Sequence, residues 1–220
     1  MSLTLHEHPF ASYCWKALIA LAELDMPFER RSVNDEADRD ALAALWPMAS
    51  IPVLVDSRAG IALPEETVII EYLDLSAGGG KLIPSDAVEA LGVRLWDRVF
   101  DNYVMTPMQK IVLDSLRDES DRDTTGVAGA RQELEQAYEM LEQRLTGSAW
   151  AAGEAFTLAD CAAAPSLFYA RVVHRWDEDR LEKLTTYYRR LEARPSVAGV
   201  IDEARPFREV FPLPWPSYVD

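Results

Sequence analysis

Cys14 stands near the start of a predicted helix, where it could act as a redox thiol. The apolar residues that follow recur at helical spacing, at Trp15, Leu18, Ile19 and Ala22. A helix N-terminus lowers the pKa of a cysteine and so favours the reactive thiolate. Cys14 also lies one turn from Leu18 on the apolar face, and cysteine is commonly buried, which favours an inert thiol. Ser12, slightly earlier in the chain, is a typical N-cap residue.

Two adjacent carboxylates, Glu65 and Glu66, open a second predicted helix. An acidic residue in the first turn stabilises a helix by about 0.3–1 kcal/mol, because it faces the positive end of the helix dipole. Pro64, directly before the pair, is also suited to a helix start. Helix stability alone therefore accounts for these two acidic residues.

Several other polar residues have an ordinary structural explanation. His6 and His8 alternate on one face of a predicted strand, but no further cysteine or carboxylate spacing supports a metal site, and none is expected. His174 lies at the end of a predicted helix, where it can interact with the helix dipole. Asp160 completes a Thr-x-x-Asp capping box that begins at Thr157, so we expect it to cap a helix and not to catalyse a reaction.

Two patterns of apolar residues define the elements that position these side chains. Up to about residue 80, short apolar runs alternate with helical segments. The runs predict strands at Leu3–Glu7, 26–33, 51–56 and 60–63, and the helical segments lie around 15–22, 38–46 and 65–75. This order mixes parallel and antiparallel strands in a compact α/β unit.

The second half of the chain has only helical patterns. Gly78, Gly79 and Gly80 precede it and are typical of a domain linker. Helices are predicted at 88–117, bent near Thr106–Pro107, and at 126–145, 179–193 and 196–204, besides the helix that the capping box begins. The tail from residue 206 alternates prolines with aromatic residues. We expect it to be extended and held to the body by Phe211, Trp215 and Tyr218.

Composition excludes several classes of protein. With 49% hydrophobic residues the chain is globular, and its 22 Lys and Arg against 37 Asp and Glu give a net charge of −15. That charge argues against nucleic acid and against an anionic membrane surface as partners. No apolar stretch reaches the roughly 18 residues of a membrane helix, and no signal peptide is recognisable. Two cysteines do not make a disulfide framework, so a reducing cytoplasm is expected.

Taken in order, several segments resemble the soluble glutathione S-transferases, especially bacterial members. They are HPFASYCWKALIALAELDMPFE, SIPVLVD and LPEETVIIEYLD in the first half and WAAGEAFTLADCAAAPSL in the second, so the resemblance covers nearly the whole chain. It implies a thioredoxin-like α/β domain over residues 1–80 and an all-helical domain over 86–220. It also implies a cytoplasmic homodimer that adds glutathione, as co-substrate, to a small hydrophobic electrophile.

The resemblance assigns roles to positions of this chain. A hydroxyl beside the first helix, here Ser12, would hold the glutathione thiolate. A cis Pro52 would turn the backbone of Ile51 toward the peptide, and the helix start at Glu65 would bind the γ-glutamyl carboxylate. The implied glutathione site comprises Ala11, Ser12, Ser50, Ile51, Pro52, Glu65 and Glu66. The implied electrophile pocket comprises Phe10, Tyr103, Thr106, Met108, Phe168 and Tyr169, with Met105, Gln109 and Val172 as further candidates.

Three positions depart from the family pattern. Ala11 stands where a hydroxyl or thiol is usual, Ser50 where a basic residue is usual, and Glu66 where serine is usual. Glu66 would repel the ligand's carboxylate by about 4 kcal/mol at ~4 Å and an effective dielectric of roughly 20, so weak or altered glutathione binding is expected. Two alternatives to a transferase stay open: a non-catalytic binding or interaction module, and a glutathione-dependent redox enzyme that works through Cys14.

Overall fold

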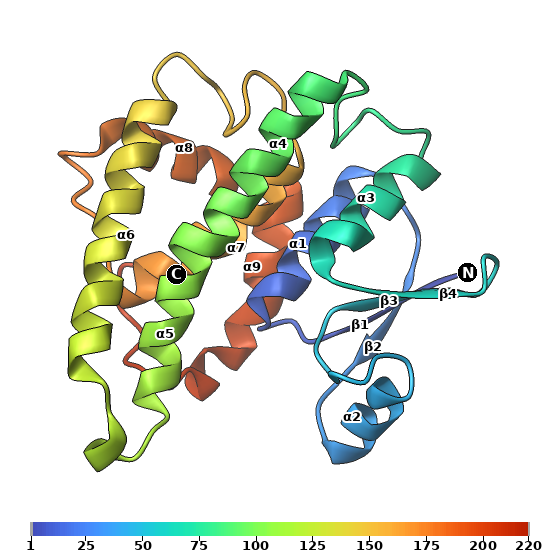
Figure 1. Ribbon diagram of the computed structural model, residues 1–220, viewed down its shortest axis with the longest axis horizontal. Helices are drawn as coiled ribbons and strands as arrows, with labels where there is room; N and C mark the ends of the chain where they lie inside the picture. Colours follow the sequence, from blue (N-terminus) through green and yellow to red (C-terminus); the bar gives the residue numbers. More distant parts are fainter. Residues whose placement is uncertain (1, 220) are drawn as a thin grey trace.

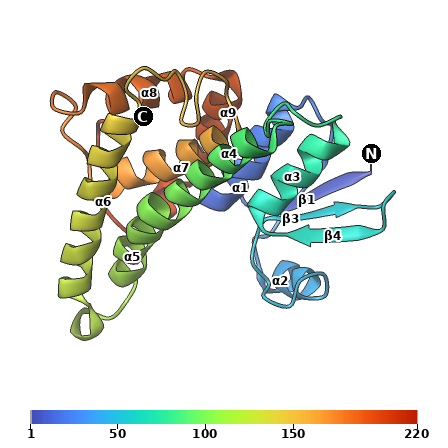
Figure 2. The ribbon, with the colours of Figure 1, turned by 45° about the horizontal axis from the view of Figure 1, so that its top comes forward.

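The computed structural model describes residues 2–219 and begins with a small mixed sheet (Figure 1). Its strands are β1 (Leu3–Glu7), β2 (Glu29–Ser32), β3 (Val53–Asp56) and β4 (Ile61–Pro64), in the spatial order β2-β1-β3-β4. The pair β1–β2 is parallel, because α1 (Ser12–Glu23) crosses between them, whereas β1–β3 and β3–β4 are antiparallel. Helices α1 and α3 (Glu66–Ser76) cover one face, and α2 (Glu36–Ala43) lies beyond the other (Figure 2).

The rest of the chain is helical. It comprises α4 (Ala87–Val99), a π-helical turn (Phe100–Met105), α5 (Thr106–Ser115), α6 (Thr124–Arg144), α7 (Leu158–Val173), α8 (Glu182–Glu192) and α9 (Pro195–Ala204), with 3₁₀ turns at Glu119–Asp121 and Arg205–Val210. Helix α7 lies at the centre of this part and is buried over nearly its whole length. The fold class is therefore as expected: a thioredoxin-like domain followed by a helical domain. No helix among residues 2–219 is long and apolar enough to cross a membrane.

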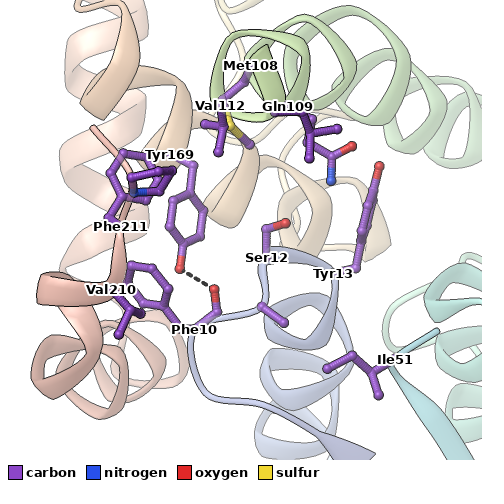
Figure 3. Close-up of a pocket in the computed structure, with 13 residues that line it drawn as sticks. Phe10, Ser12, Tyr13, Ile51, Met108, Gln109, Val112, Tyr169, Val210 and Phe211 are labelled. Carbon is purple, nitrogen blue, oxygen red and sulfur yellow. Dashed lines mark hydrogen bonds between the residues drawn. The ribbon is translucent and has the colours of Figure 1, made fainter. Parts of the chain in front are cut away.

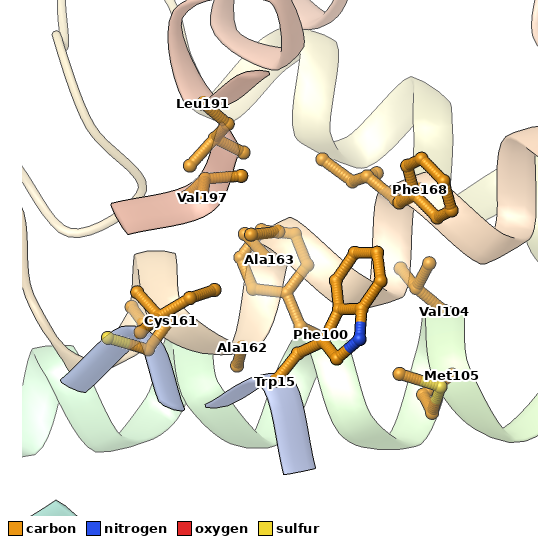
Figure 4. Packing of buried hydrophobic residues seen from close by; sticks show 14 of the residues in the cluster. Trp15, Phe100, Val104, Met105, Cys161, Ala162, Ala163, Phe168, Leu191 and Val197 are labelled. Atoms are coloured by element: carbon orange, nitrogen blue, oxygen red, sulfur yellow. The ribbon is translucent and has the colours of Figure 1, made fainter. Parts of the chain in front are cut away.

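The two parts share one hydrophobic core. Trp15 of α1 is fully buried, and its ring lies 4.9 Å from that of Phe168 and 5.3 Å from that of Tyr169, both on α7 (Figure 4). Small residues of α7 such as Ala162 and Ala163 allow neighbouring helices to approach closely. Because α1 also carries the candidate site at its N-terminus, this packing fixes the site relative to the helical domain.

The predicted capping box is confirmed, and it anchors α7. Both the backbone N–H and the hydroxyl of Thr157 donate to Asp160 Oδ2, at 2.8 and 3.2 Å. The backbone N–H of Ala151 and the hydroxyl of Tyr187 donate to Oδ1, at 2.9 and 2.7 Å. Burial is the main reason that the pKa of Asp160 is raised, although all of these bonds oppose it.

Some element boundaries differ from the sequence prediction. The strand predicted at 26–33 is shorter in the structure, where β2 begins at Glu29. The preceding Phe28 lies in a loop and packs against the core. The segment predicted as one helix at 88–117 has a π-helical turn over Phe100–Met105, just before Pro107. At this turn the hydroxyl of Thr106 donates a hydrogen bond to the carbonyl of Asp101 at 2.9 Å. The helix predicted at 179–193 begins only at Glu182, and the tail is a 3₁₀ turn over Arg205–Val210 before it becomes irregular.

Candidate active site

Two cavities meet at the N-terminus of α1, and Figure 3 shows the residues that line one of them. One is mostly apolar and has a volume of about 400 Å³, the other is polar and has about 370 Å³, and Tyr13 and Ile51 line both. The apolar cavity is lined by Phe10, Ala11, Ser12, Tyr13, Ile51, Met108, Gln109, Val112, Leu113, Tyr169, Val210, Phe211 and Pro212. The polar cavity is lined by Tyr13, Ser50, Ile51, Glu65, Glu66, Arg98, Asp101, Asn102 and Thr106.

Ser12 lines the apolar cavity and does not cap the helix. The N-cap of α1 is Ala11, which has no side chain able to cap, and Ser12 is the first helical residue. The interpretation of Ser12 as an N-cap is therefore wrong. Its hydroxyl makes no hydrogen bond to another residue among 2–219, and Figure 3 shows it directed into the space between α1 and α5. A free hydroxyl beside uncapped backbone amides is suited to binding an anion.

Tyr13 is a second hydroxyl at this place, and the sequence analysis did not single it out. Its ring stands at the junction of the two cavities (Figure 3). Burial, followed by the negative charges of Asp101 and Glu66, raises the pKa of Tyr13 to about 12. The hydroxyl is therefore protonated near neutral pH and can donate a hydrogen bond. Its position next to Ser12 in the first turn of α1 was the available signal.

The loop before β3 presents free peptide groups to the polar cavity. The Ile51–Pro52 bond is cis, as the resemblance implies. The N–H and C=O of Ile51 have no backbone partner within residues 2–219, so they can pair with an extended peptide. The hydroxyl of Ser50 accepts a hydrogen bond from the indole of Trp46 at 3.1 Å.

The N-terminus of α3 faces the same polar cavity. Its N-cap, Glu65, has a φ of +67°, which is unusual for a residue other than glycine, and its side chain does not cap the helix. The first amides of α3 are thus available to an anionic group. Glu66, the first helical residue, is only 9% exposed, and its Oε1 accepts a hydrogen bond from Lys16 Nζ at 3.1 Å. The carboxylate at this position is engaged within the protein.

Lys16 is the centre of a buried charge cluster beneath the polar cavity. Its Nζ lies 2.8 Å from Asp101 Oδ2, 2.9 Å from Asp97 Oδ1 and 3.1 Å from Glu66 Oε1. Burial alone would lower the pKa of Lys16, but the three carboxylates outweigh it and raise the pKa. Arg98 adds a second positive charge, since its Nη1 lies 3.0 Å from Asp101 Oδ2.

The residues predicted to line an electrophile pocket lie in different parts of the structure. Phe10, Met108, Gln109 and Tyr169 line the apolar cavity, whereas Thr106 lines the polar one. Three other candidates, Met105, Phe168 and Val172, are buried in the core, and Tyr103 is 59% exposed outside both cavities. Tyr103 and Met105 lie in the π-helical turn, whose wider turn changes the directions of its side chains. Phe168 and Val172 lie on α7, which is buried over nearly its whole length.

Other walls of the apolar cavity come from segments that the sequence analysis did not assign to it. Helix α5 adds Val112 and Leu113, and the C-terminal tail adds Val210, Phe211 and Pro212. The ring of Phe211 packs against those of Phe10 and Trp215, and the Tyr169 hydroxyl donates to the carbonyl of Phe10 at 2.8 Å. The aromatic residues of the tail do hold it to the body, as expected.

The remaining candidates do not face either cavity. Cys14 is fully buried, and burial is the main reason that its pKa is raised, so its thiol is not activated. His6 is also buried, which lowers its pKa, and His8 packs edge-on against Phe207. Within residues 2–219, no three His, Cys, Asp or Glu side chains lie close enough together to hold a metal ion.

Comparisons with known proteins agree with this architecture. Residues 5–81 match the family model of the glutathione S-transferase N-terminal domain, and residues 119–190 match that of the C-terminal domain. The chain is 30% identical over 151 residues to the glutathione S-transferase-like protein LUC7 of a Fusarium species, a match that covers 67% of this chain and 68% of that protein. It is 27% identical over 193 residues to glutathione S-transferase GstB of Escherichia coli, covering 84% and 91%.

Solved structures give the same result. A glutathione S-transferase from Methylobacterium radiotolerans, in complex with glutathione sulfonate, superposes with a TM-score of 0.78 at 29% identity, covering 90% of this chain and 93% of that one. The agreement extends over both the sheet-containing and the helical part. The chain therefore belongs to the glutathione S-transferase family.

Proposed function

We propose that the protein adds the thiol of glutathione to a hydrophobic electrophile. The observation that carries this proposal is the junction of the two cavities at Ser12 and Tyr13. A thiolate held there by neutral hydroxyl donors and backbone amides would face the apolar cavity, while its peptide occupied the polar one. Rate acceleration would come from stabilisation of the thiolate and from proximity, without a general base.

The peptide would lie along the cis-proline loop toward α3. Ile51 would pair with its backbone, the first amides of α3 would hold the γ-glutamyl carboxylate, and Glu65 would accept from the ammonium group. Four carboxylates, those of Glu65, Glu66, Asp97 and Asp101, surround this end of the site, against the two cations Lys16 and Arg98. We therefore propose that glutathione binds weakly. The dissociation constant would be in the millimolar range, which corresponds to a binding free energy of roughly 4 kcal/mol.

Two measurements test this function. Calorimetric titration with glutathione should give a millimolar dissociation constant, and a micromolar value would contradict the weak binding. Turnover of a chloronitrobenzene should fall by at least about tenfold in Ser12→Ala, since one donor to the thiolate is lost. Ser120→Ala removes an exposed hydroxyl far from the cavities and serves as the matched control.

Other outcomes would favour the alternatives. A folded wild-type protein that turns over no electrophile would be a binding or interaction module. Reduction of a glutathione mixed disulfide, lost in Cys14→Ser, would indicate a redox enzyme. The burial of Cys14 argues against the second alternative.

We further propose that the protein is a homodimer of the cytoplasm. The exposed faces of α3 and α4 carry five apolar side chains that are 48–77% exposed: Val68, Leu75, Val88, Leu91 and Leu95. The two helices are joined by the Glu71–Arg94 ion pair at 2.6 Å, so these side chains belong to one rigid surface. A second copy with the same surface would cover it by twofold symmetry. Two free, buried cysteines suit a reducing compartment.

A further inference from the structure

The apolar cavity has a polar end formed by three side chains. Ser12, Tyr13 and Gln109 are directed toward the same side of it, Gln109 from α5 and the other two from α1 (Figure 3). None of the three side chains makes a hydrogen bond to another residue within 2–219. The fourth polar side chain of the cavity, Tyr169, is already engaged, because its hydroxyl donates to the carbonyl of Phe10.

Gln109 differs from the other two in its position. Ser12 stands at the helix start, where the thiolate is proposed to lie, and Tyr13 borders both cavities. Of these two cavities Gln109 borders only the apolar one. Gln109 also borders a third cavity, which is lined by charged residues such as Lys110 and Asp114. In the apolar cavity α5 also contributes Met108, Val112 and Leu113, so Gln109 is the polar residue of α5 among the described residues that line it. It therefore faces the electrophile and not the peptide.

We propose that Gln109 is a further catalytic residue, whose carboxamide donates a hydrogen bond to an oxygen atom of the electrophile. The site then selects electrophiles in which a carbonyl oxygen is conjugated with the carbon that sulfur attacks. This inference rests on the proposed conjugation activity and adds the class of electrophile to it. Among residues 2–219 no charged side chain lines the cavity, so negative charge on the electrophile must be stabilised by neutral donors. Tyr13, which stays protonated near neutral pH, is the second donor in reach of this end.

The reaction is a conjugate addition. The glutathione thiol first loses its proton to water, and the thiolate sulfur forms a bond to the β-carbon. The π electrons of the C=C bond shift toward the carbonyl, whose oxygen takes the negative charge of an enolate. Gln109 stabilises that oxygen more strongly in the transition state than in the ground state, which is the condition for catalysis. The α-carbon then takes a proton from water, so no oxidant or reductant is needed.

Two electrophiles with the same phenyl ring test the inference. Benzylideneacetone carries the conjugated carbonyl, whereas benzyl chloride reacts by displacement of chloride and has no oxygen. Gln109→Leu should lower kcat/KM for benzylideneacetone by at least about tenfold, and it should lower the ratio of this value to that for benzyl chloride by a similar factor. Gln109→Glu keeps the shape and replaces the donor by an acceptor, so the same ratio should fall at least as far.

Val112→Ala is the matched control, because it enlarges the same cavity from the same helix without removing a donor. It should change both kcat/KM values by similar factors. Equal losses for both electrophiles in Gln109→Leu and Gln109→Glu would overturn the inference, since Gln109 would then act by packing alone. A folded wild-type protein that turns over neither compound would overturn the proposed function as well.

Discussion

The ammonium group of Lys16 lies 2.8 Å from Oδ2 of Asp101, and no part of the lysine is exposed to solvent. The contact joins α1, whose first turn holds Ser12 and Tyr13, to the π-helical turn that precedes α5. Asp97 of α4 and Glu66 of α3 share the same ammonium group, so one cation on α1 connects three other elements around the polar cavity. The geometry of the candidate site therefore depends on the buried positive charge of Lys16, which water cannot reach.

Replacing Lys16 by methionine should destabilise the protein strongly. The variant keeps most of the side-chain volume but leaves three carboxylates without their shared cation, and removing one partner of a buried ion pair costs roughly 3–5 kcal/mol. The free energy of unfolding, measured in urea, should fall by about that amount.

The matched control for that measurement is Lys110→Met. Lys110 is half exposed, and its Nζ lies 3.9 Å from Asp123. Its loss should cost less than about 1 kcal/mol, as is usual for an exposed pair. Equal effects of the two substitutions would contradict the central role of Lys16.

Asp101 should give the protein a pH-dependent stability. Burial raises its pKa from an ordinary value of 3.8 to about 6, against the opposing attraction of Lys16 and alongside repulsion by Asp97 and Glu66. Because the pKa is higher in the folded state, the folded protein binds the proton more tightly than the unfolded chain does. The stability from this group is complete below about pH 4 and is lost as the pH rises through about 6.

The measurement compares wild type with Asp101→Asn. Between about pH 4 and pH 6, the free energy of unfolding of the wild type should fall by about 2 kcal/mol relative to the variant, and the difference should become constant only above about pH 7. A difference that does not change with pH would show that Asp101 has an ordinary pKa.

Local motifs made one part of the site predictable from sequence. The helix starts near Ser12 and Glu65 are indicated by a few adjacent residues, whereas the cis bond before Pro52 was implied only by the family resemblance. Their contacts are not encoded in that way. Lys16 is 50 residues from Glu66 and 85 from Asp101, and nothing in the pattern around Lys16 identifies these partners.

The walls of the apolar cavity were harder to predict for a related reason. The resemblance places Tyr103 in the pocket, but Tyr103 is 59% exposed and lies in the π-helical turn Phe100–Met105, which is not visible in a pattern of apolar residues. Phe211 lies on an irregular tail whose path is decided by aromatic packing against Phe10 and Tyr169. Propensity and periodicity describe regular elements and say little about such a tail.

Neither cysteine should react in the native protein. Cys14 and Cys161 are both fully buried, and burial raises the pKa of each thiol. Alkylation by iodoacetamide, followed by mass spectrometry, should proceed only at the rate of unfolding and should become fast in urea. Stoichiometric labelling of Cys14 in the folded protein would contradict this expectation and would revive the redox alternative.

A charge in the proposed interface should dissociate the dimer. Leu91 on α4 is 64% exposed, and Leu91→Glu would place one carboxylate from each copy in the proposed interface. Light scattering after size-exclusion chromatography should then give the mass of a monomer. Leu116→Glu is the matched control: Leu116 follows α5, is 66% exposed and lies outside the proposed surface, so this variant should stay dimeric. A monomeric wild type would rule out the proposal.

Serine in place of Glu66 should strengthen glutathione binding. The substitution removes a carboxylate at the start of α3 and leaves the first amides of that helix uncapped, which favours the γ-glutamyl carboxylate. Lys16 keeps Asp97 and Asp101 as partners, so the ammonium group stays paired. Because Lys16 already offsets part of the charge of Glu66, we expect a gain of about tenfold in affinity, or about 1.4 kcal/mol, less than the repulsion of an unpaired carboxylate.

Calorimetric titration of wild type and Glu66→Ser with glutathione provides the measurement. Glu71→Ser is a suitable control, because Glu71 lies further along α3, pairs with Arg94 and lines neither cavity. It should leave the affinity within about twofold, as expected for a charge screened by solvent. If Glu66→Ser binds glutathione no better than wild type, the carboxylate of Glu66 is neutralised completely by Lys16, and weak binding must then be attributed to Glu65 and Asp101.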